Sequence, residues 1–208
     1  MASTAARAVL RVSKVPLFVQ DQGVGAEGAG PVVLLSGGVD SAVVLALLSE
    51  AGRVPAALWV NYGQPAAFAE ARASEALAEQ YGAAWSRVDV RGLAPPAAGE
   101  FPGRNDLLVA TAGCFGAGAP VAIGVHAGTG YADCSPGWAY GWQAHFAAQR
   151  PGGGTLLAPL IDASKADVLA LARELAIPID LTYSCETGSE PCGRCSSCMD
   201  RGGFDARP

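Results

Sequence analysis

The chain has 208 residues, half of them hydrophobic, and a formal net charge of -5. This length and content can bury a full core and fit one domain better than two, so we expect a leader at residues 1–30 and a single domain at residues 31–208. The negative charge argues against a large nucleic-acid surface, which is normally rich in Lys and Arg. No apolar run approaches the roughly eighteen residues of a membrane span. We therefore expect a cytoplasmic protein with neither a nucleic-acid nor a membrane partner.

The leader carries no functional signal. It is rich in small residues and has no acid before Asp21, a composition also found in organelle transit peptides. We favour a frayed leader with one short strand at residues 8–19.

Apolar stretches alternate with helical stretches along the rest of the chain. This pattern is typical of a Rossmann-like, doubly wound parallel sheet in an α/β fold, with ligands at the carboxyl ends of the strands. Pro65 suits a first helical turn, Gly82 is placed to end that helix, and Ser164 is a natural N-cap. We expect strands at residues 32–35, 56–60, 84–90, 121–125 and 155–157, and helices at residues 41–51, 65–81, 105–115, 136–148 and 164–175.

Residues 36–41 read Ser-Gly-Gly-Val-Asp-Ser, between the first expected strand and helix. Two glycines allow a sharp turn in which backbone N–H groups converge on anionic oxygens, and the helix N-terminus adds positive dipole. Ser36 and Ser41 add hydroxyl donors, and Asp40 either caps the helix or orients Mg²⁺. An ordinary turn with Asp40 as N-cap is the alternative, but the whole string favours nucleotide phosphate.

The glycine spacing fits neither a Walker A loop, since no lysine follows the glycines, nor the G-x-G-x-x-G dinucleotide fingerprint. It resembles the pyrophosphate loop of the ATP pyrophosphatases, or PP-loop enzymes. Those enzymes transfer AMP to a carboxylate or carbonyl oxygen and release pyrophosphate. The resemblance implies ATP with Mg²⁺, and activation chemistry rather than phosphate transfer to a hydroxyl.

Four cysteines near the C-terminus form the pattern C-x6-C-x2-C-x2-C. Four thiolates match a closed, tetrahedral, structural Zn²⁺ site. Disulfides are disfavoured in a cytosolic chain, and an iron–sulfur cluster is the sharper alternative. Of the two remaining cysteines, we expect Cys114 to be a small core residue. The predicted metal ligands are Cys185, Cys192, Cys195 and Cys198.

Taken in order, the motifs are similar to those of one family, the 7-cyano-7-deazaguanine synthases of the QueC type. The similarity runs from about residue 32 to residue 201. It implies ATP-dependent conversion of 7-carboxy-7-deazaguanine and ammonia to the nitrile preQ0, through an acyl-adenylate and an amide, in a homodimer. The motifs are the pyrophosphate loop, Asn61-Tyr62-Gly63-Gln64, Pro102-Gly103-Arg104-Asn105, Tyr131-Ala132-Asp133-Cys134, Ser164-Lys165-Ala166-Asp167 and the cysteine pattern.

The resemblance also implies roles for individual residues. Arg104, Lys165 and Asp40 are the catalytic candidates, because cations and a metal must neutralise charge as pyrophosphate departs. Each role has an alternative. Lys165 could be a solvated charge at a helix start, and Arg104 a surface arginine beside an N-cap Asn105. Asp133 could be an exposed loop acid. ATP contacts are expected at Leu35, Ser36, Gly37, Gly38, Val39, Asp40, Ser41, Tyr62 and Gly63, and substrate contacts at Phe101, Arg104, Asn105, His126, Tyr131, Asp133 and Cys134.

The chain departs from the family pattern in two places. Residues 91–100 are shorter than the usual insertion, and residues 126–134 lack the family's Asn-Ala-x-Asp-x-Ser-Gly loop beside the substrate. One alternative is therefore an enzyme that stops at the amide or joins the deazaguanine acyl group to an amine on a protein partner. A PP-loop tRNA-modifying enzyme and a non-catalytic nucleotide-binding scaffold are the others.

Overall fold

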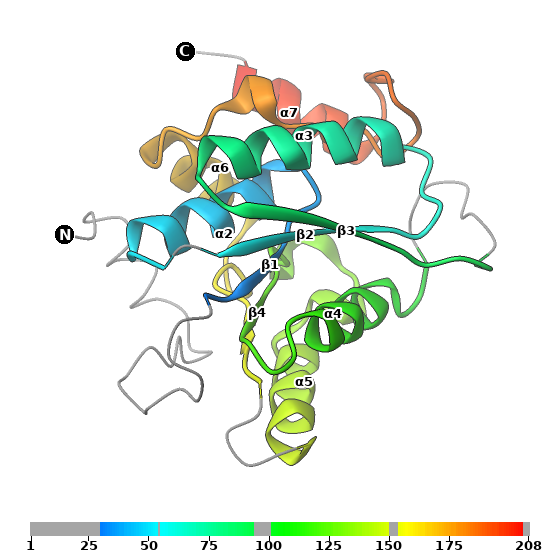
Figure 1. Ribbon diagram of the computed structural model, residues 1–208. Coiled ribbons are helices and arrows are strands. Elements are labelled where there is room, and N and C mark those ends of the chain that lie inside the picture. The colour runs from blue at the N-terminus through cyan, green and yellow to red at the C-terminus, as the bar shows by residue number, and fades with distance from the viewer. Residues whose placement is uncertain (1–29, 54, 94–100, 150–153, 206–208) are drawn as a thin grey trace.

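The computed structural model describes residues 30–53, 55–93, 101–149 and 154–205. The strand expected at residues 8–19 lies outside these ranges. Five parallel strands form one sheet in the order β3-β2-β1-β4-β5 (Figure 1). The strands are β1 (Val32–Leu34), β2 (Ala56–Asn61), β3 (Ala84–Asp89), β4 (Val121–Ala122) and β5 (Leu156–Leu157).

Helices cover both faces of the sheet (Figure 1). One face carries α2 (Val39–Glu50), α3 (Ala67–Gln80), α6 (Lys165–Glu174) and α7 (Ser196–Asp205), and the other carries α4 (Arg104–Phe115) and α5 (Pro136–Gln149).

Burial of both faces explains why the strands are continuous apolar runs. Val33 of β1 packs with α2, α3 and α6, whereas Val32 and Leu34 pack with α4 and α5. Alternate side chains of one strand thus enter two different cores, as a doubly covered parallel sheet requires. The predicted fold class is confirmed.

The fourth strand is shorter than predicted. Its ladder ends at Ala122 because the chain then runs against the first turn of α2, where a Cβ on Gly124 would lie 2.8 Å from the backbone carbon of Asp40. Only a glycine permits that approach.

Two helix ends agree with the sequence and one does not. At Gly82 (φ +65°) the N–H groups of residues 82 and 83 return to the carbonyls of Glu79 and Ala78, which is a Schellman ending. Ser164 caps α6 as predicted. The predicted start of α3 at Pro65 is wrong, since the helix begins at Ala67.

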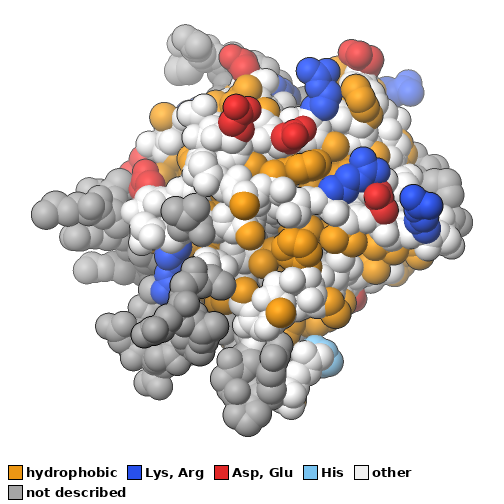
Figure 2. Space-filling view, in the orientation of Figure 1, with side chains coloured by type: hydrophobic (Ala, Val, Ile, Leu, Met, Phe, Trp, Pro, Cys, Tyr) orange, Lys and Arg blue, Asp and Glu red, His pale blue; other side chains and the backbone are white. Residues whose placement is uncertain are grey.

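Helix α7 was not predicted, because Ser196–Asp205 contains Cys198 of the predicted metal site, two adjacent glycines and few large apolar residues. Within the described ranges, no helix is long and apolar enough to cross a membrane. On the face shown in Figure 2, basic side chains are interspersed with acidic ones rather than gathered into a stripe.

Candidate functional site

The phosphate loop, residues 36–41, joins β1 to α2. Gly37 has φ +87°, a left-handed conformation that favours glycine, and Gly38 is the N-cap of α2. The Ser41 hydroxyl donates to the Gly38 carbonyl at 2.9 Å and lies 3.1 Å from the Ser36 hydroxyl. The alternative of Asp40 as N-cap is wrong, because Asp40 lies inside the first helical turn. Its carboxylate faces the sheet edge instead of capping the helix.

Two basic side chains from other parts of the chain, Lys165 and His126, lie beside the Asp40 carboxylate. Lys165 Nζ donates to the two carboxylate oxygens of Asp40 at 2.7 and 3.1 Å, and His126 Nε2 lies 3.6 Å from Oδ2. The buried His126 accepts the Gly128 N–H at Nδ1. Burial lowers the pKa of His126, the Asp40 charge opposes this, and the Lys165 charge reinforces it. Because Nδ1 accepts a hydrogen bond, Nε2 is the ring nitrogen that faces Asp40.

A capping box positions Lys165. The Ser164 hydroxyl accepts the Asp167 N–H at 3.2 Å, and the Asp167 carboxylate accepts the Ser164 N–H at 2.9 Å. The hydrogen bonds from Ser164 also lower the pKa of Asp167. Because the box fixes the start of α6, Lys165 is its first residue and is held against Asp40 rather than left as a solvated charge.

A cavity of about 660 Å³ opens at the carboxyl ends of the strands and collects most of the predicted site. Gly37, Gly63, Phe101 and Asp133 are not in its lining. The predicted residues that line it are Leu35, Ser36, Gly38, Val39, Asp40, Ser41, Tyr62, Arg104, Asn105, His126, Tyr131, Cys134 and Lys165.

Asn105 and Asp133 hold the wall of this cavity. The N-cap of α4 is Gly103, so the interpretation of Asn105 as an N-cap is wrong. Asn105 is buried, and its side chain donates to the Asp133 carbonyl at 3.0 Å and approaches Cys134 Sγ at 3.5 Å. The Asp133 carboxylate accepts the Asn105 N–H at 3.2 Å. Asp133 is thus turned toward the start of α4 instead of into the cavity.

Two further residues of the cavity, Gln64 and Glu70, were not among the predicted contacts. Gln64 donates to Glu70 Oε2 at 2.8 Å and to the Val60 carbonyl at 3.1 Å. Burial raises the pKa of Glu70, although hydrogen bonding to Gln64 and Trp59 and the charge of Arg104 act in the opposite direction. Glu70 was missed because an acid in the first turn of an amphipathic helix is ordinarily a surface residue.

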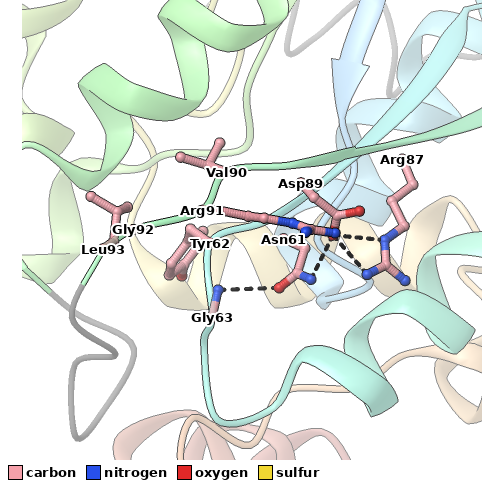
Figure 3. A pocket seen from close by; sticks show the side chains of 9 residues that line it. All are labelled: Asn61, Tyr62, Gly63, Arg87, Asp89, Val90, Arg91, Gly92 and Leu93. Atoms are coloured by element: carbon pink, nitrogen blue, oxygen red, sulfur yellow. Dashed lines mark hydrogen bonds and ion pairs between the residues drawn. The ribbon is translucent and has the colours of Figure 1, made fainter.

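A second cavity, of about 300 Å³, lies beside the ends of β2 and β3 and includes Gly63 (Figure 3). Its polar groups satisfy one another: Asp89 accepts from Asn61 at 2.7 Å and from Arg87 at 2.7 Å, which lowers the pKa of Asp89. The larger cavity, where the phosphate loop and the Asp40–Lys165 pair meet, is therefore the candidate active site.

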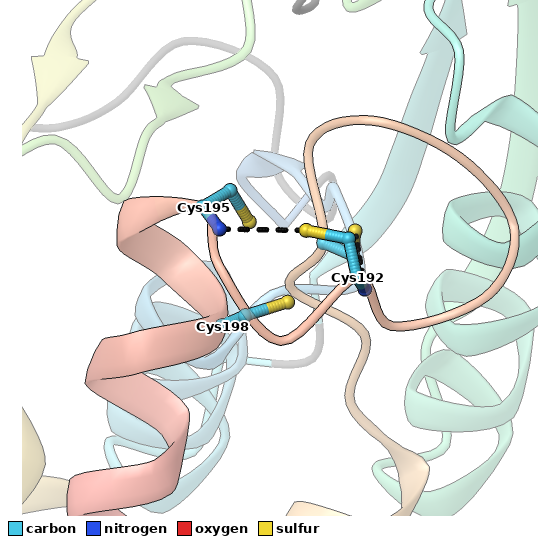
Figure 4. A group of neighbouring side chains, drawn as sticks. Cys192, Cys195 and Cys198 are labelled. Carbon is cyan, nitrogen blue, oxygen red and sulfur yellow. Dashed lines mark hydrogen bonds between the residues drawn. The ribbon is translucent and has the colours of Figure 1, made fainter.

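The four predicted metal ligands converge, with their sulfur atoms all within 4.8 Å of one another (Figure 4). Backbone N–H groups point at the sulfurs, as Cys192 N donates to Cys185 Sγ and Cys195 N to Cys192 Sγ, each at 3.4 Å. Hydrogen bonding from the Arg194 N–H lowers the pKa of Cys192 to about 5. Closely grouped sulfurs with thiolate-stabilising donors suit a thiophilic metal.

All six cysteines are free in the structure. Cys134 is buried. Cys114 is exposed on α4, so its predicted place in the core is wrong. Val109 and Ala112, five and two residues earlier on the same helix, face the core instead.

Comparisons with known proteins agree with these motifs. The model of the family described as Queuosine biosynthesis protein QueC matches residues 30–97 and 96–206. A 7-cyano-7-deazaguanine synthase of Synechococcus sp. (strain RCC307) is 36% identical over 203 residues, covering 82% of this chain and 91% of that protein. The synthase of Aquifex aeolicus (strain VF5) is 33% identical over 205 residues, covering 83% and 94%.

Two solved structures share the fold. The U34-tRNA thiolase NcsA of Methanococcus maripaludis with its [4Fe-4S] cluster is 19% identical, with a TM-score of 0.56, over 97% of this chain and 70% of that one. NMN synthetase of Francisella tularensis is also 19% identical, with a TM-score of 0.51, over 97% and 82%.

Proposed function

Because this chain belongs to the QueC family of queuosine biosynthesis proteins, as its motifs predicted, we propose that it uses ATP to convert 7-carboxy-7-deazaguanine and ammonia to the nitrile preQ0. One observation carries the proposal. The phosphate loop, Arg104 and the Asp40–Lys165 pair line a single cavity at the carboxyl edge of a parallel sheet. Open α/β sheets bind their ligands at this edge.

The first step activates the carboxylate. The ATP phosphates lie against residues 36–41, where backbone N–H groups, two serine hydroxyls and the positive end of α2 stabilise anionic oxygens. A carboxylate oxygen of the substrate attacks the α-phosphorus, and pyrophosphate leaves. Lys165 and Arg104 stabilise the charge that develops, and Asp40 holds Lys165 in place until substrate arrives. Mg²⁺, bound through Asp40, would neutralise the pyrophosphate leaving group.

The next steps form the nitrile. Ammonia attacks the acyl carbon, AMP leaves with the C–O electrons, and the amine loses a proton to give the amide. The amide oxygen then attacks the α-phosphorus of a second ATP and releases pyrophosphate. Loss of AMP and of the N–H protons converts the C–N bond to the nitrile. Both activations require the same arrangement of phosphate loop and cations, so one cavity serves both.

The substrate is recognised by residues on the cavity wall opposite the phosphate loop. Tyr131, which is half exposed, stacks on the deazapurine ring, and Asn105 and Cys134 form the floor below it. Phe101 acts through Tyr62, whose ring it contacts edge-on at a centroid distance of 5.7 Å. Asp133 contributes by holding the first turn of α4, through the Asn105 N–H.

Zn²⁺ is the metal we propose for the cysteines, as a structural ion with no open coordination position. Four sulfur ligands complete a tetrahedral site, which is the usual geometry of structural zinc. An iron–sulfur cluster uses the same four ligands, and metal analysis of the purified chain distinguishes the two. We also propose that the protein is a homodimer, on the family resemblance alone, which light scattering tests.

A second candidate reaction stops at the amide or transfers the acyl group to an amine on a protein. The loop at residues 126–134 favours it. The loop folds into two short 3-10 helices, 127–129 and 132–134, and leaves Tyr131 51% exposed at the mouth of the cavity. An open mouth admits an amine larger than ammonia.

Product analysis decides between the two. Purified protein is incubated with ATP, Mg²⁺, 7-carboxy-7-deazaguanine and ammonium, and products are identified by mass. The nitrile with release of AMP and pyrophosphate supports the first reaction. Amide that accumulates without nitrile supports the second, and the absence of AMP release with this acid contradicts both.

A further inference from the structure

The phosphate loop is held from two sides, and one of the two supports, Tyr183, is bonded to the cysteine loop, residues 185–198. On the first side, a Cβ on Gly37 would lie 2.8 Å from both the Ala73 Cβ and the Glu70 carbonyl oxygen, so the loop lies directly on α3. On the second side, the Gly37 carbonyl accepts the Tyr183 N–H at 2.8 Å. Helix α3 blocks movement of the phosphate loop in one direction. The hydrogen bond from Tyr183 on the other side therefore sets the position of the loop.

Tyr183 is tied to the cysteine loop at its own side chain. Its hydroxyl donates to the Gly188 carbonyl at 2.5 Å, inside the loop, and Cys185 follows it by two residues. The Tyr183 carbonyl also lies 3.6 Å from the position of a Cβ on Gly38. The backbone of Tyr183 is therefore in contact with both glycines of the phosphate loop.

The short 3-10 helix before Tyr183, Ile179–Leu181, is clamped by α7, the helix that contains Cys198. The Arg201 guanidinium donates to the Thr182 carbonyl at 2.7 Å, to the Thr182 hydroxyl at 2.8 Å and to the Ile179 carbonyl at 3.0 Å. Thr182 is buried, and its hydroxyl donates in turn to the Ile179 carbonyl at 2.7 Å. Arg201 stands three residues after Cys198 and so moves with it.

A bound metal ion would fix these parts relative to one another. It would hold Cys195 and Cys198, just before and in the first turn of α7, against Cys185, two residues after Tyr183. Without the ion, the four grouped sulfurs would lose their common partner. Arg201 and Tyr183 then lose the constraint that aligns them with the phosphate loop.

We propose that the cysteine loop positions the phosphate loop: metal binding and ATP binding are thermodynamically coupled through the contact of Tyr183 N–H with the Gly37 carbonyl. Tyr183, Thr182 and Arg201 act as positioning residues in this coupling. The inference rests on the proposed function, which identifies residues 36–41 as the ATP site. Coupling of this kind is reciprocal, so each ligand must raise the affinity for the other by the same factor.

The test measures both affinities on the full chain under reducing conditions. Zinc affinity is measured by competition with a chromogenic chelator, with and without saturating α,β-methylene ATP. Affinity for the nucleotide is measured by calorimetry, with and without zinc. We expect each ligand to raise the affinity of the protein for the other by about fivefold or more, which is the lower end of typical allosteric coupling.

Two variants separate positioning from simple stabilisation. Thr182→Val removes the buried hydroxyl between Arg201 and Ile179 while preserving shape, and Thr182 is not in the cavity lining. It should reduce the coupling factor toward one. Thr111→Val, on α4 at the opposite face of the sheet, is the matched control and should retain the full factor.

Each outcome is decisive. Nucleotide binding that is equal with and without zinc overturns the inference and leaves the proposed function intact. The absence of nucleotide binding to the zinc-loaded chain overturns both. Circular dichroism of the zinc-free chain must remain that of the folded protein. If the chain unfolds on zinc removal, or if Thr182→Val leaves the coupling unchanged, local positioning is wrong.

Discussion

Lys165 Nζ lies 2.7 Å from Asp40 Oδ1, although the two residues are 125 positions apart in the chain. The pair joins the first turn of α2 to the first residue of α6 across the carboxyl edge of the sheet. Both side chains are about three-quarters buried, with 29% and 27% of their surfaces exposed. In the absence of nucleotide, Lys165 has a carboxylate partner where it would otherwise lie uncompensated at a helix N-terminus, which is unfavourable for a cation.

The first prediction concerns this pair. Lys165→Met should lower kcat by about 100-fold or more, because it removes a donor to the charge that develops on the phosphates. Asp40→Asn should have an effect of similar size. The double variant should be much less impaired than the product of the two single effects, because residues in contact are not independent. Steady-state kinetics with separate kcat and KM for ATP provides the measurement.

Arg173→Met, which removes an exposed cation from the last turn of α6, is the control. Its kcat should match that of the unaltered protein. Fully multiplicative effects in the Lys165 and Asp40 double variant would mean that the two residues act separately.

The second prediction concerns the conformation of Gly37. Gly37→Ala should destabilise the protein and abolish nucleotide binding, because the residue has φ +87° and its new Cβ would meet α3 at 2.8 Å. Gly82→Ala is a matched control, with φ +65° and no atom within 4 Å of the added Cβ. The control should lose about 1 kcal/mol from left-handed strain alone. Gly37→Ala should lose roughly 1–3 kcal/mol more from the clash.

Urea unfolding gives both free energies, and calorimetry gives nucleotide affinity. Equal losses for the two variants would show that the contact with α3 relaxes without cost. Retention of nucleotide binding in Gly37→Ala would place the phosphates elsewhere.

The third prediction is the pH dependence of stability caused by His126. Burial lowers its pKa below the ordinary value of 6.5, so the unfolded chain binds more protons than the folded one as the pH falls below 6.5. The free energy of unfolding should therefore decrease from pH 6.5 downward until the depressed pKa is passed. His126→Asn should flatten this part of the profile, because the amide oxygen can replace Nδ1 as acceptor of the Gly128 N–H and carries no titrating proton.

His145→Asn, at an exposed position on α5, serves as the control and should leave the profile unchanged. The measurement is urea unfolding at half-unit steps of pH. An identical slope for His126→Asn and the unaltered protein would contradict a buried, neutral His126.

The fourth prediction concerns the metal. The purified chain should contain one zinc ion, measured by elemental analysis, and no iron. Cys192→Ala should lose the ion and lower the melting temperature, because the remaining three sulfurs leave the site open. Cys114→Ala removes an exposed cysteine outside the cluster and should keep the ion. Iron with labile sulfide in the unaltered protein would instead identify a cluster.

Part of the fold and of the candidate site could be predicted from residues that are close together in the sequence. The turn at residues 36–41, the order of the strands along the chain, the Gly82 helix end, the Ser164 cap and the grouping of the four cysteines depend on local backbone geometry and short spacings. Helix α7 was missed because its short segment contains a cysteine of the predicted metal site and two adjacent glycines, which do not favour a helix. The predicted start of α3 was also wrong, because Pro65 lies before the first residue of the helix.

The direction of the site side chains was decided only by tertiary structure. Asp133 turns to the N–H of Asn105, Glu70 is drawn into the cavity beside Gln64, and Tyr183 reaches Gly37. Each of these contacts joins elements whose relative placement depends on how helices pack on the two faces of the sheet. Chain order and hydrophobic period specify which face a helix covers. They do not specify which polar atom meets which, because that depends on the packing of side chains distant in sequence.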